Sequence, residues 1–429
     1  MQGWARACGY TARVSQTPDD ILILGGGAIG LATALSLLEA GRSVRIIDAG
    51  AIGHGASHGN CGTITPSHAP PLAAPGVVAQ ALRWMFTPDA PLYLKPRVDP
   101  ALWQWLWRFS RRCNRRDWSA STQARAALLD DSRQRLVDWI ARYQLACEFH
   151  EEGLDYVFRN RRLFERYVNE CETLAGLGIA SEIFSGSDYE RQEPAMLPGV
   201  AGAIRFPDDA RLRPDRYVAE LARVVGERGG QFETDCRATG LQADAQGVSV
   251  QTSRGQRRAR EVVIALGAWT PAFARQLGVR TPIQPGKGYS ITYSRPPLMP
   301  RRPLVLKDVS VCVTGWDSGF RLGSTMEFSG YNDELNATRL SALERGARQF
   351  LREPVGAVVE ERWCGWRPMT YDDLPLLGPA PRQPHVWLAA GHGMLGISMS
   401  AATGQLMADL ITGQTPAINP TPYRPERFA

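Results

Sequence analysis

Residues 21–30 read Ile-Leu-Ile-Leu-Gly-Gly-Gly-Ala-Ile-Gly, and this stretch decides the fold of the first part of the chain. Its four leading apolar residues predict a short buried strand, and its glycines predict a tight turn. Residues 28–40 then have the composition of a helix, and residues 43–48 predict a second buried strand. The order strand, glycine turn, helix, strand predicts a β-α-β unit at the start of an α/β domain.

The glycines at positions 25, 27 and 30 fit the pattern GxGxxG of dinucleotide-binding domains. In that pattern Gly25 permits the turn, Gly27 lets a pyrophosphate approach the backbone, and Gly30 allows close packing of helix on strand. The helix N-terminus then presents its partial positive charge to the phosphates. Asp48 ends the second strand, where a carboxylate can accept hydrogen bonds from ribose hydroxyls. The motif alone does not distinguish FAD from NAD.

Composition excludes several classes of protein. With 44% hydrophobic and 21% charged residues in 429, the chain is an ordinary globular protein with room for more than one domain. The net charge of +6 is spread along the chain without a dense basic tail, so we expect no nucleic-acid partner. The eight cysteines form no CxxC pair and no cluster with histidine, so we expect no metal site. Residues 1–20 lack the apolar run of a signal peptide and are expected to be an extension.

Three further segments suit a bound dinucleotide. Residues 53–62, Gly-His-Gly-Ala-Ser-His-Gly-Asn-Cys-Gly, are small and polar, as in a loop around a pyrophosphate and a flavin; the alternative is a surface loop. Residues 261–269, Glu-Val-Val-Ile-Ala-Leu-Gly-Ala-Trp, predict a strand that ends at Gly267, whose alternative is a plain buried strand. Residues 391–396, Gly-His-Gly-Met-Leu-Gly, precede a predicted helix, whose dipole can stabilise negative charge on a reduced flavin.

Together, six segments resemble the FAD-dependent amine and amino-acid oxidoreductases of the D-amino-acid oxidase and glycine oxidase superfamily. The nearest resemblance is to bacterial D-amino-acid dehydrogenases, with D-hydroxyproline dehydrogenases as close neighbours. Two residues depart from that pattern: Asp48 stands where glutamate is more usual, and His58 stands where tryptophan is frequent. The six segments are GGGAIG (25–30), GHGASHGNCG (53–62), PPLAAPGVVAQALRWMFTPDAPLYLKP (70–96), KGYSIT (287–292), GWRPMTYDDLPLLG (365–378) and GHGMLGISMSAATGQLMADL (391–410).

The resemblance implies an α/β fold, in which a Rossmann-type FAD-binding domain is interleaved with an α+β substrate domain built on an antiparallel sheet. We expect the FAD-binding domain at 21–80, 205–280 and 365–420, and the substrate domain at 81–204 and 281–364. The implied cofactor is non-covalent FAD, with backbone near Arg237 at the adenine and residues 391–396 at the isoalloxazine. The expected cofactor-binding residues are Gly25, Gly27, Ala28, Ile29, Gly30, Asp48, Gly55, Ala56, Ser57, Asn60, Cys61, Gly62, Thr63, Arg237, Gly267, Trp269, Gly391, His392, Gly393, Met394, Leu395 and Gly396.

Three residues are candidates for the substrate site. By the resemblance, the carboxylate-binding arginine of the family falls at Arg367, and a guanidinium holds a carboxylate through two parallel hydrogen bonds. Tyr289 could join Arg367 on the carboxylate or cover the substrate; the alternative is a tyrosine packed in the sheet. His392 is the third candidate, and its alternative is a packed polar residue. Asp372 and Asp373 are adjacent, so their side chains point apart and we interpret them as turn formers.

We therefore expect oxidation of D-amino or D-imino acids by hydride transfer from the substrate Cα to flavin N5. A cyclic secondary amine such as cis-4-hydroxy-D-proline is a narrower hypothesis, and the expected acceptor is a quinone or another respiratory electron carrier. One alternative is a glycine- or sarcosine-type oxidase that produces hydrogen peroxide. Another is a flavoprotein subunit that acts only within a complex. An NAD-dependent dehydrogenase gains no support from residues 391–396.

Residues 70–118 combine many aromatic side chains with arginines, which suits a surface at a lipid interface. The apolar and aromatic residues include Trp84, Met85 and Phe86 with their neighbours, and then Trp103 and Trp107. We expect a cytoplasmic protein with peripheral contact to the cytoplasmic face of the inner membrane. The alternative is that these tryptophans pack the helices of the substrate domain.

Overall fold

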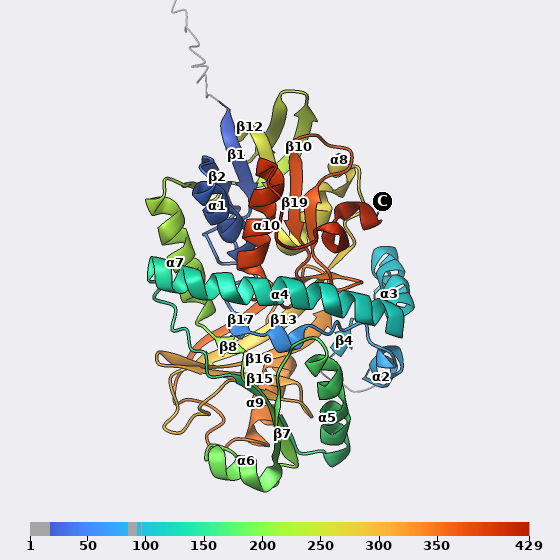
Figure 1. Ribbon diagram of the computed structural model, residues 1–429, viewed down its shortest axis with the longest axis vertical. Coiled ribbons are helices and arrows are strands. Elements are labelled where there is room, and N and C mark those ends of the chain that lie inside the picture. Colours follow the sequence, from blue (N-terminus) through green and yellow to red (C-terminus); the bar gives the residue numbers. More distant parts are fainter. Residues whose placement is uncertain (1–17, 85–91, 96, 429) are drawn as a thin grey trace, which may run out of the picture.

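The computed structural model describes residues 18–84, 92–95 and 97–428. Most of the expected N-terminal extension, together with Met85 and Phe86, lies outside these residues. The described chain forms two bodies stacked along the long axis, with one long helix crossing between them (Figure 1). That helix is α4 (Arg115–Tyr143).

The upper body is built on a largely parallel sheet in the order β10-β11-β12-β1-β2-β9, with β19 beside β12 and β18 beside β19. Helix α1 (Ala28–Glu39) packs against α10 (Ser400–Thr412) and α7 (Pro214–Glu227). Residues 21–24 are fully buried, as expected for a parallel strand that is covered on both faces. The strands are β1 (Asp19–Leu24), β2 (Val44–Ile47), β9 (Gln231–Glu233), β10 (Ala238–Asp244), β11 (Gly247–Thr252), β12 (Gly255–Ile264), β18 (Leu376–Pro379) and β19 (Val386–Ala390).

The lower body is built on a mainly antiparallel sheet in the order β17-β13-β16-β15-β14-β5-β7-β6, with β4 beside β16. The pairs β14–β5 and β16–β4 are parallel. The strands are β4 (Leu92–Leu94), β5 (Leu154–Phe158), β6 (Glu182–Ser185), β7 (Gly202–Phe206), β13 (Ile283–Tyr293), β14 (Leu304–Leu306), β15 (Val311–Trp316), β16 (Gly319–Phe328) and β17 (Val359–Thr370).

The two faces of this second sheet have different neighbours. On one face, Ile291, Leu304 and Leu306 pack with Leu340 and Leu343 of α9 (Ala337–Arg348) in a separate apolar core. On the other face, alternate residues of the same strands line a large cavity. The second sheet therefore supplies one wall of that cavity.

Helices on the flank of the second sheet are α2 (Val77–Trp84), α3 (Pro100–Arg112) and α5 (Arg161–Ala175). Helix α3 ends before Asn114, which caps α4 by accepting a hydrogen bond from the Asp117 amide at 3.0 Å. The short strands β3 (Thr63–Ile64) and β8 (Ala210–Arg211) pair with each other. The remaining short helices are α6 (Gly186–Gln192) and α8 (Ala274–Leu277). The 3-10 turns are Pro66–His68, Gly267–Phe273, Thr421–Tyr423 and Pro425–Phe428.

The expected fold class is confirmed: a Rossmann-type α/β body is interleaved with an α+β body on a largely antiparallel sheet. We propose the expected division of the chain into two domains, with one adjustment. Strands β7 and β17 belong to the second sheet, so the expected boundaries at 205 and 365 fall inside strands of that sheet. Within the described ranges, no helix combines the length and apolar character needed to cross a membrane.

Candidate functional site

A cavity of about 2530 Å³ runs between the two sheets. Its lining comes from the β1–α1 turn, the loop after β2, the 3-10 turn after β12, strand β17 and the segment before α10. Of the expected cofactor-binding residues, Gly30, Gly62 and Gly391 do not line this cavity, whereas the others do. The sequence segments selected above therefore meet at one place in the fold.

The β1–α1 turn is built so that only glycine fits at two positions. Gly25 has φ +105°, and a Cβ there would lie 2.5 Å from the Ala265 carbonyl oxygen. A Cβ on Gly30 would lie 1.9 Å from the Gly25 carbonyl oxygen. These contacts bring α1 close to the end of β1, as the motif requires. Gly30 thus has the packing role expected of it.

The N-terminus of α1 faces the cavity. Gly27 is the N-cap and has no side chain to satisfy the first amides, and the first turn contains no acidic residue. The Ala28 amide donates to the Ser57 hydroxyl at 3.1 Å. The other first-turn amides have no intrahelical acceptor. Gly27, Ala28 and Ile29 all line the cavity, so these donors and the helix dipole suit a pyrophosphate.

Asp48 is fixed at the end of β2. Its Oδ2 accepts a hydrogen bond from the Gly26 amide at 2.7 Å, and its Oδ1 accepts one from the Gly50 amide at 3.0 Å. A carboxylate has about four acceptor sites. The remaining sites can accept from the two hydroxyls of a ribose, which is the role that the sequence predicted for Asp48.

The loop after β2 is held by its own side chains and by a buried arginine. The Asn60 side chain donates to the Ser57 carbonyl at 2.7 Å and accepts from the Gly62 amide at 2.7 Å. Arg321, which is 1% exposed, donates to the carbonyl oxygens of His58 at 3.1 Å and Asn60 at 2.8 Å. Sequence reasoning missed Arg321, because nothing local distinguishes it among so many arginines.

His58, one of the two departures from the family pattern, pairs with Glu361. Its Nε2 lies 2.8 Å from Glu361 Oε1. The hydrogen bond with His58 holds the pKa of the Glu361 carboxyl below its usual range. The pair ties the cofactor loop to β17, the strand that carries Arg367.

The segment 391–396 contacts the strand of Arg367 directly. The Gly393 amide donates to the Pro368 carbonyl at 3.1 Å, and His392 forms an isolated bridge with Met369. The His392 ring lies 3.0 Å from the Thr403 hydroxyl, and burial lowers the pKa of His392 to about 3. His392 is therefore neutral at physiological pH. It lines the cavity but is also the packed polar residue of the alternative interpretation.

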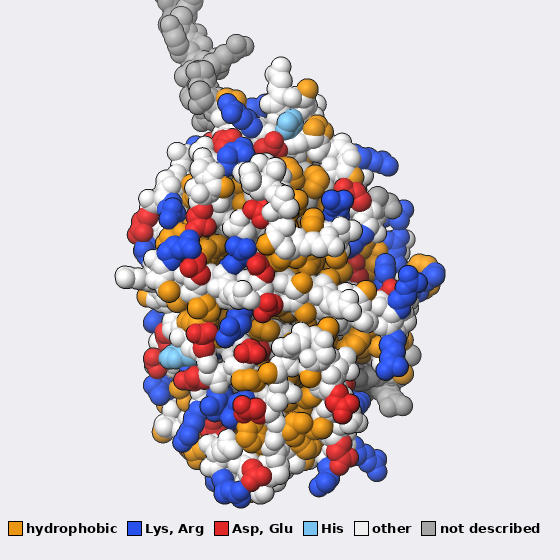
Figure 2. All heavy atoms as spheres, viewed as in Figure 1, with side chains coloured by type: hydrophobic (Ala, Val, Ile, Leu, Met, Phe, Trp, Pro, Cys, Tyr) orange, Lys and Arg blue, Asp and Glu red, His pale blue; other side chains and the backbone are white. Residues whose placement is uncertain are grey.

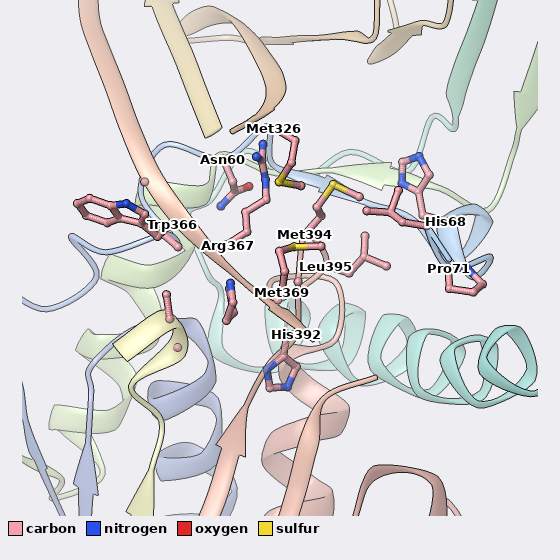
Figure 3. A pocket seen from close by; sticks show the side chains of 18 of the residues that line it. Asn60, His68, Pro71, Met326, Trp366, Arg367, Met369, His392, Met394 and Leu395 are labelled. Atoms are coloured by element: carbon pink, nitrogen blue, oxygen red, sulfur yellow. The ribbon is translucent and has the colours of Figure 1, made fainter. Parts of the chain in front are cut away.

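Arg367 projects from β17 into the cavity with no acidic partner (Figure 3). Its Nη1 donates to the Thr325 carbonyl at 2.8 Å, and no ion pair of this guanidinium exists among the described residues. Burial lowers the pKa of Arg367, and the groups that act against this are the thiols of Cys61 and Cys312. A half-buried guanidinium that lacks a carboxylate partner favours the binding of an anion. This arrangement suits the carboxylate of a small ligand.

One role expected for Tyr289, in which its hydroxyl joins Arg367 on the substrate carboxylate, is wrong. Its hydroxyl donates to Glu327 Oε2 at 3.0 Å, and its ring belongs to the apolar core on the far face of the sheet. Neighbouring residues of a strand point to opposite faces, and it is Gly288 that lies beneath Arg367. The Tyr289 hydroxyl therefore does not share a ligand with Arg367, although the residue borders the cavity.

The strand predicted to reach Gly267 is shorter than expected. Strand β12 ends at Ile264, and Gly267 has φ +53° and opens a 3-10 turn that contains Pro271. Trp269 lies in this turn beside two aromatic residues that sequence reasoning missed. Its ring is 6.2 Å from that of Tyr331 and 5.4 Å from that of Trp366. Trp269 and Trp366 line the cavity, as do Arg237 and Gly267.

Asp372 and Asp373 are structural, as expected. Asp372 Oδ2 accepts a hydrogen bond from Arg427 at 2.9 Å. Asp373 has φ 57° and accepts from the Leu72 amide at 2.5 Å. Neither residue is an acid or base at the cavity.

Comparison with known proteins agrees with this geometry. The chain matches the family described as FAD dependent oxidoreductase over residues 20–410. It is 32% identical to a D-amino acid dehydrogenase of Agrobacterium fabrum over 432 residues, which cover 96% of this chain and 100% of that protein. It is 30% identical to a D-amino acid dehydrogenase of Granulibacter bethesdensis over 417 residues, or 95% and 99% of the two chains.

Solved structures show the same fold at lower identity. The glycine oxidase of Geobacillus kaustophilus matches with a TM-score of 0.77 at 22% identity and covers 95% of this chain and 98% of its own. An L-proline dehydrogenase of P. horikoshii matches with a TM-score of 0.71 at 17% identity, over 96% and 98%. The glycine turn, the helix N-terminus and Asp48 suit a dinucleotide such as FAD, and the chain belongs to the FAD dependent oxidoreductase family.

Proposed function

We propose that this protein is an FAD-dependent dehydrogenase of D-amino or D-imino acids. The observation that carries the proposal is the Arg367 guanidinium, which faces the cavity without an acidic partner beside the segment 391–396. A cation in this position selects ligands with a carboxylate. The names of the relatives at 30% and 32% identity support D-amino acids as the substrate class.

Arg367 binds the substrate carboxylate and so fixes the direction of the Cα–H bond. Because the Gly393 amide bonds to the Pro368 carbonyl, the strand of Arg367 and the cofactor segment keep a constant separation. Trp366, Met326 and Met369 line the same part of the cavity and give it an apolar wall (Figure 3). FAD, when bound, supplies the acceptor for the hydride that leaves the substrate Cα.

The described chain places no carboxylate beside Arg367 that could act as a general base. The carboxylates that line the cavity are Asp48, Glu170 and Asp308, and Glu327 is held by Tyr289 on the far face of the sheet. A neutral substrate amine needs no such base, because its nitrogen lone pair assists departure of the hydride. We propose that the amine loses its proton to solvent before oxidation and that positioning supplies most of the rate.

The test is a substrate panel with two readouts. The holoenzyme is mixed with D- and L-amino acids, glycine, sarcosine and cis-4-hydroxy-D-proline, and dye reduction and peroxide are measured in parallel. We expect dye reduction with D-amino or D-imino acids and little peroxide. Stoichiometric peroxide with glycine or sarcosine would identify the oxidase alternative. Flavin reduction by substrate without turnover would identify a subunit that needs a partner.

We also propose that the FAD is held non-covalently. Cys61 lines the cavity, but its thiol lies against Cys312 and Gly323. The thiol of Cys364, three residues before Arg367, does not line the cavity and donates to the Asp333 carbonyl at 3.4 Å. Acid precipitation should release all the flavin as FAD into the supernatant. Yellow colour retained in the precipitate would show a covalent bond.

We propose a quinone or another electron carrier as acceptor, with peripheral contact to the cytoplasmic face of a membrane. Helix α3 has the surface that supports this: Trp103 is 55% exposed and Trp107 is 57% exposed, with Arg111 5.1 Å above the Trp107 ring. Basic and apolar side chains lie together over α3 at the edge of the molecule (Figure 2). Trp105, in contrast, is 5% exposed and packs in the core, as the alternative interpretation held.

A further inference from the structure

The cavity continues across the second sheet, well past Arg367. In Figure 3, Arg367 lies near Asn60 and Met326 at one end of the cavity. His68 and Pro71 lie at the opposite end. The His68 ring stacks on the Tyr156 ring at 5.6 Å between centroids. From there the lining passes to Lys307, on the turn after β14, and to residues of α5. No part of the flavin site described above uses this end of the cavity.

Lys307 lies at this end of the cavity beside two tyrosine rings. Its Nζ lies 4.3 Å from the ring centroid of Tyr156 and 4.4 Å from that of Tyr167. In the described part of the chain, Lys307 makes no side-chain hydrogen bond and no ion pair. Lys287, by comparison, donates to the Glu334 carbonyl. An ammonium group has three donors, so Lys307 presents unused donors to the cavity.

The neighbours of Lys307 include two carboxylates, neither of which forms an ion pair with its ammonium group. Both carboxylate oxygens of Asp308 accept backbone hydrogen bonds, from the Arg159 amide at 3.0 Å and the Asn160 amide at 2.8 Å. His68 is neutral, because burial, with help from Lys307 and Arg125, lowers its pKa to about 3. Glu170 on α5 also lines this end, and although burial raises the pKa of its carboxyl, the charge of Lys307 acts against this rise. The two side chains interact at a distance and form no ion pair. The donors of the Lys307 ammonium therefore stay available to an anionic group in this end of the cavity.

Strand register places the two cations at opposite ends of one line across the sheet. Arg367 bonds to Thr325 on β16, one residue after Ser324, which pairs with Val311 on β15. Val311 in turn pairs with Leu306 on β14, one residue before Lys307. Strand β15 lies between β16 and β14, so these two strands are two interstrand spacings apart. The Lys307 side chain extends further, toward β5, so the charged groups of Arg367 and Lys307 are roughly 10–14 Å apart. After about 3 Å for a hydrogen bond at each end, roughly 4–8 Å remains between two carboxylates.

We propose that Lys307, Tyr156 and Tyr167 form a subsite for a second carboxylate of the substrate. The preferred substrates are then D-amino or D-imino acids with an acidic side chain, of the length of glutamate or somewhat longer. Arg367 binds the carboxylate next to the reacting carbon, and Lys307 binds the distal one. This inference rests on the proposed function, because it assigns the second half of the same substrate.

A binding titration tests the subsite without turnover. The flavin absorbance of the holoenzyme is followed during titration with the unreactive dicarboxylates glutarate, adipate and pimelate, and with the monocarboxylates butyrate and hexanoate. We expect Lys307→Met to raise the Kd of the best dicarboxylate by about tenfold or more, as for loss of a hydrogen bond to a charged group. The Kd values of the monocarboxylates should stay the same.

Two further variants sharpen the result. Lys95→Met removes an exposed lysine elsewhere and should leave every Kd unchanged. Lys307→Glu should reverse the preference, so that D-ornithine or D-lysine gains in kcat/KM over D-glutamate. Equal losses for mono- and dicarboxylates in Lys307→Met, or an equal effect of Lys95→Met, would overturn the subsite. If no D-amino acid reduces the flavin, the proposed function fails, whereas the titration still decides whether Lys307 binds a second carboxylate.

Discussion

The guanidinium of Arg367 lies directly above Gly288 on the neighbouring strand. A Cβ on Gly288 would lie 2.2 Å from Nη1 and 2.4 Å from Cζ of Arg367. Arg367 itself pairs with Gly286, and its side chain crosses β13 to reach the Thr325 carbonyl on β16. The absence of a side chain at 288 is therefore what allows Arg367 to lie flat across the sheet and face the cavity.

Gly288→Ala tests this relationship. The added methyl group has no room unless the guanidinium moves, so we expect KM for the amino acid to rise by about 10- to 100-fold while FAD stays bound. Steady-state kinetics and the flavin spectrum measure the two effects. Gly226→Ala is the matched control, because the methyl group added there would lie 3.7 Å from its nearest neighbour, the Phe232 ring. Unchanged kinetics in Gly288→Ala would mean that Arg367 does not bind the substrate from this position.

Removal of the cation should have a larger effect. Arg367→Ala deletes a charged bidentate contact, which costs about 2–5 kcal/mol, or roughly 30- to 4,000-fold in kcat/KM. Arg367→Lys should restore little, because lysine lacks the planar pair of donors. Both variants should keep the flavin spectrum of the parent enzyme. If Arg367→Ala keeps full kcat/KM, the carboxylate site lies elsewhere.

Sequence and structure differ most where distant segments meet. The strand, glycine turn and helix of residues 21–40 follow local rules, so the sequence predicted them to within a few residues. The bulge between Lys287 and Tyr289, in contrast, is a property of the pairing of β13 with β16. No local pattern reveals that Tyr289 points to the far face while Gly288 lies under Arg367.

Single charged residues were equally hard to predict. Arg321 and Lys307 lie in no motif, and each has neighbours in the fold that are remote in sequence. Arg367 was identified only through the resemblance of residues 365–378 to a family. Composition alone does not distinguish Arg321, Lys307 or Arg367 from the other basic residues of the chain.

Gly27→Val should separate folding from cofactor binding. Gly27 has extended backbone geometry, and the atom nearest to a Cβ at this position is the Ser57 hydroxyl at 3.4 Å, so the protein should still fold. The new side chain would occupy the space that a pyrophosphate needs at the start of α1. We expect a colourless protein with the melting temperature of the wild-type apoprotein. FAD bound at the wild-type ratio would place the pyrophosphate elsewhere.

Membrane contact through α3 is testable by flotation. Trp103→Ser combined with Trp107→Ser should reduce binding to vesicles that contain anionic lipid, because both rings are more than half exposed. The effect should be strongest at low salt, where arginines such as Arg111 attract the lipid. Ile183→Ser, at a 51% exposed position on β6, is the control and should leave binding unchanged. A wild-type protein that stays in solution at low salt would contradict the peripheral contact.

The buried histidines predict a loss of stability in acid. His392 and His68 both have a pKa lowered to about 3 by burial, against an ordinary value of about 6.5 in the unfolded chain. Between these two values the unfolded state binds more protons, so the free energy of unfolding falls as pH decreases from about 6.5 toward 3. The slope should reach up to about 1.4 kcal/mol per pH unit for each histidine.

His392→Gln tests this, because the new amide can still bond to Thr403. The variant should lose the part of the slope that His392 contributes. Urea unfolding at pH 4.5, 5.5 and 6.5 (about the range set by these pKa values) measures the free energy of unfolding. The exposed His54→Gln should leave the slope unchanged. A wild-type slope in His392→Gln would show that His392 binds a proton equally well in the folded and unfolded chain.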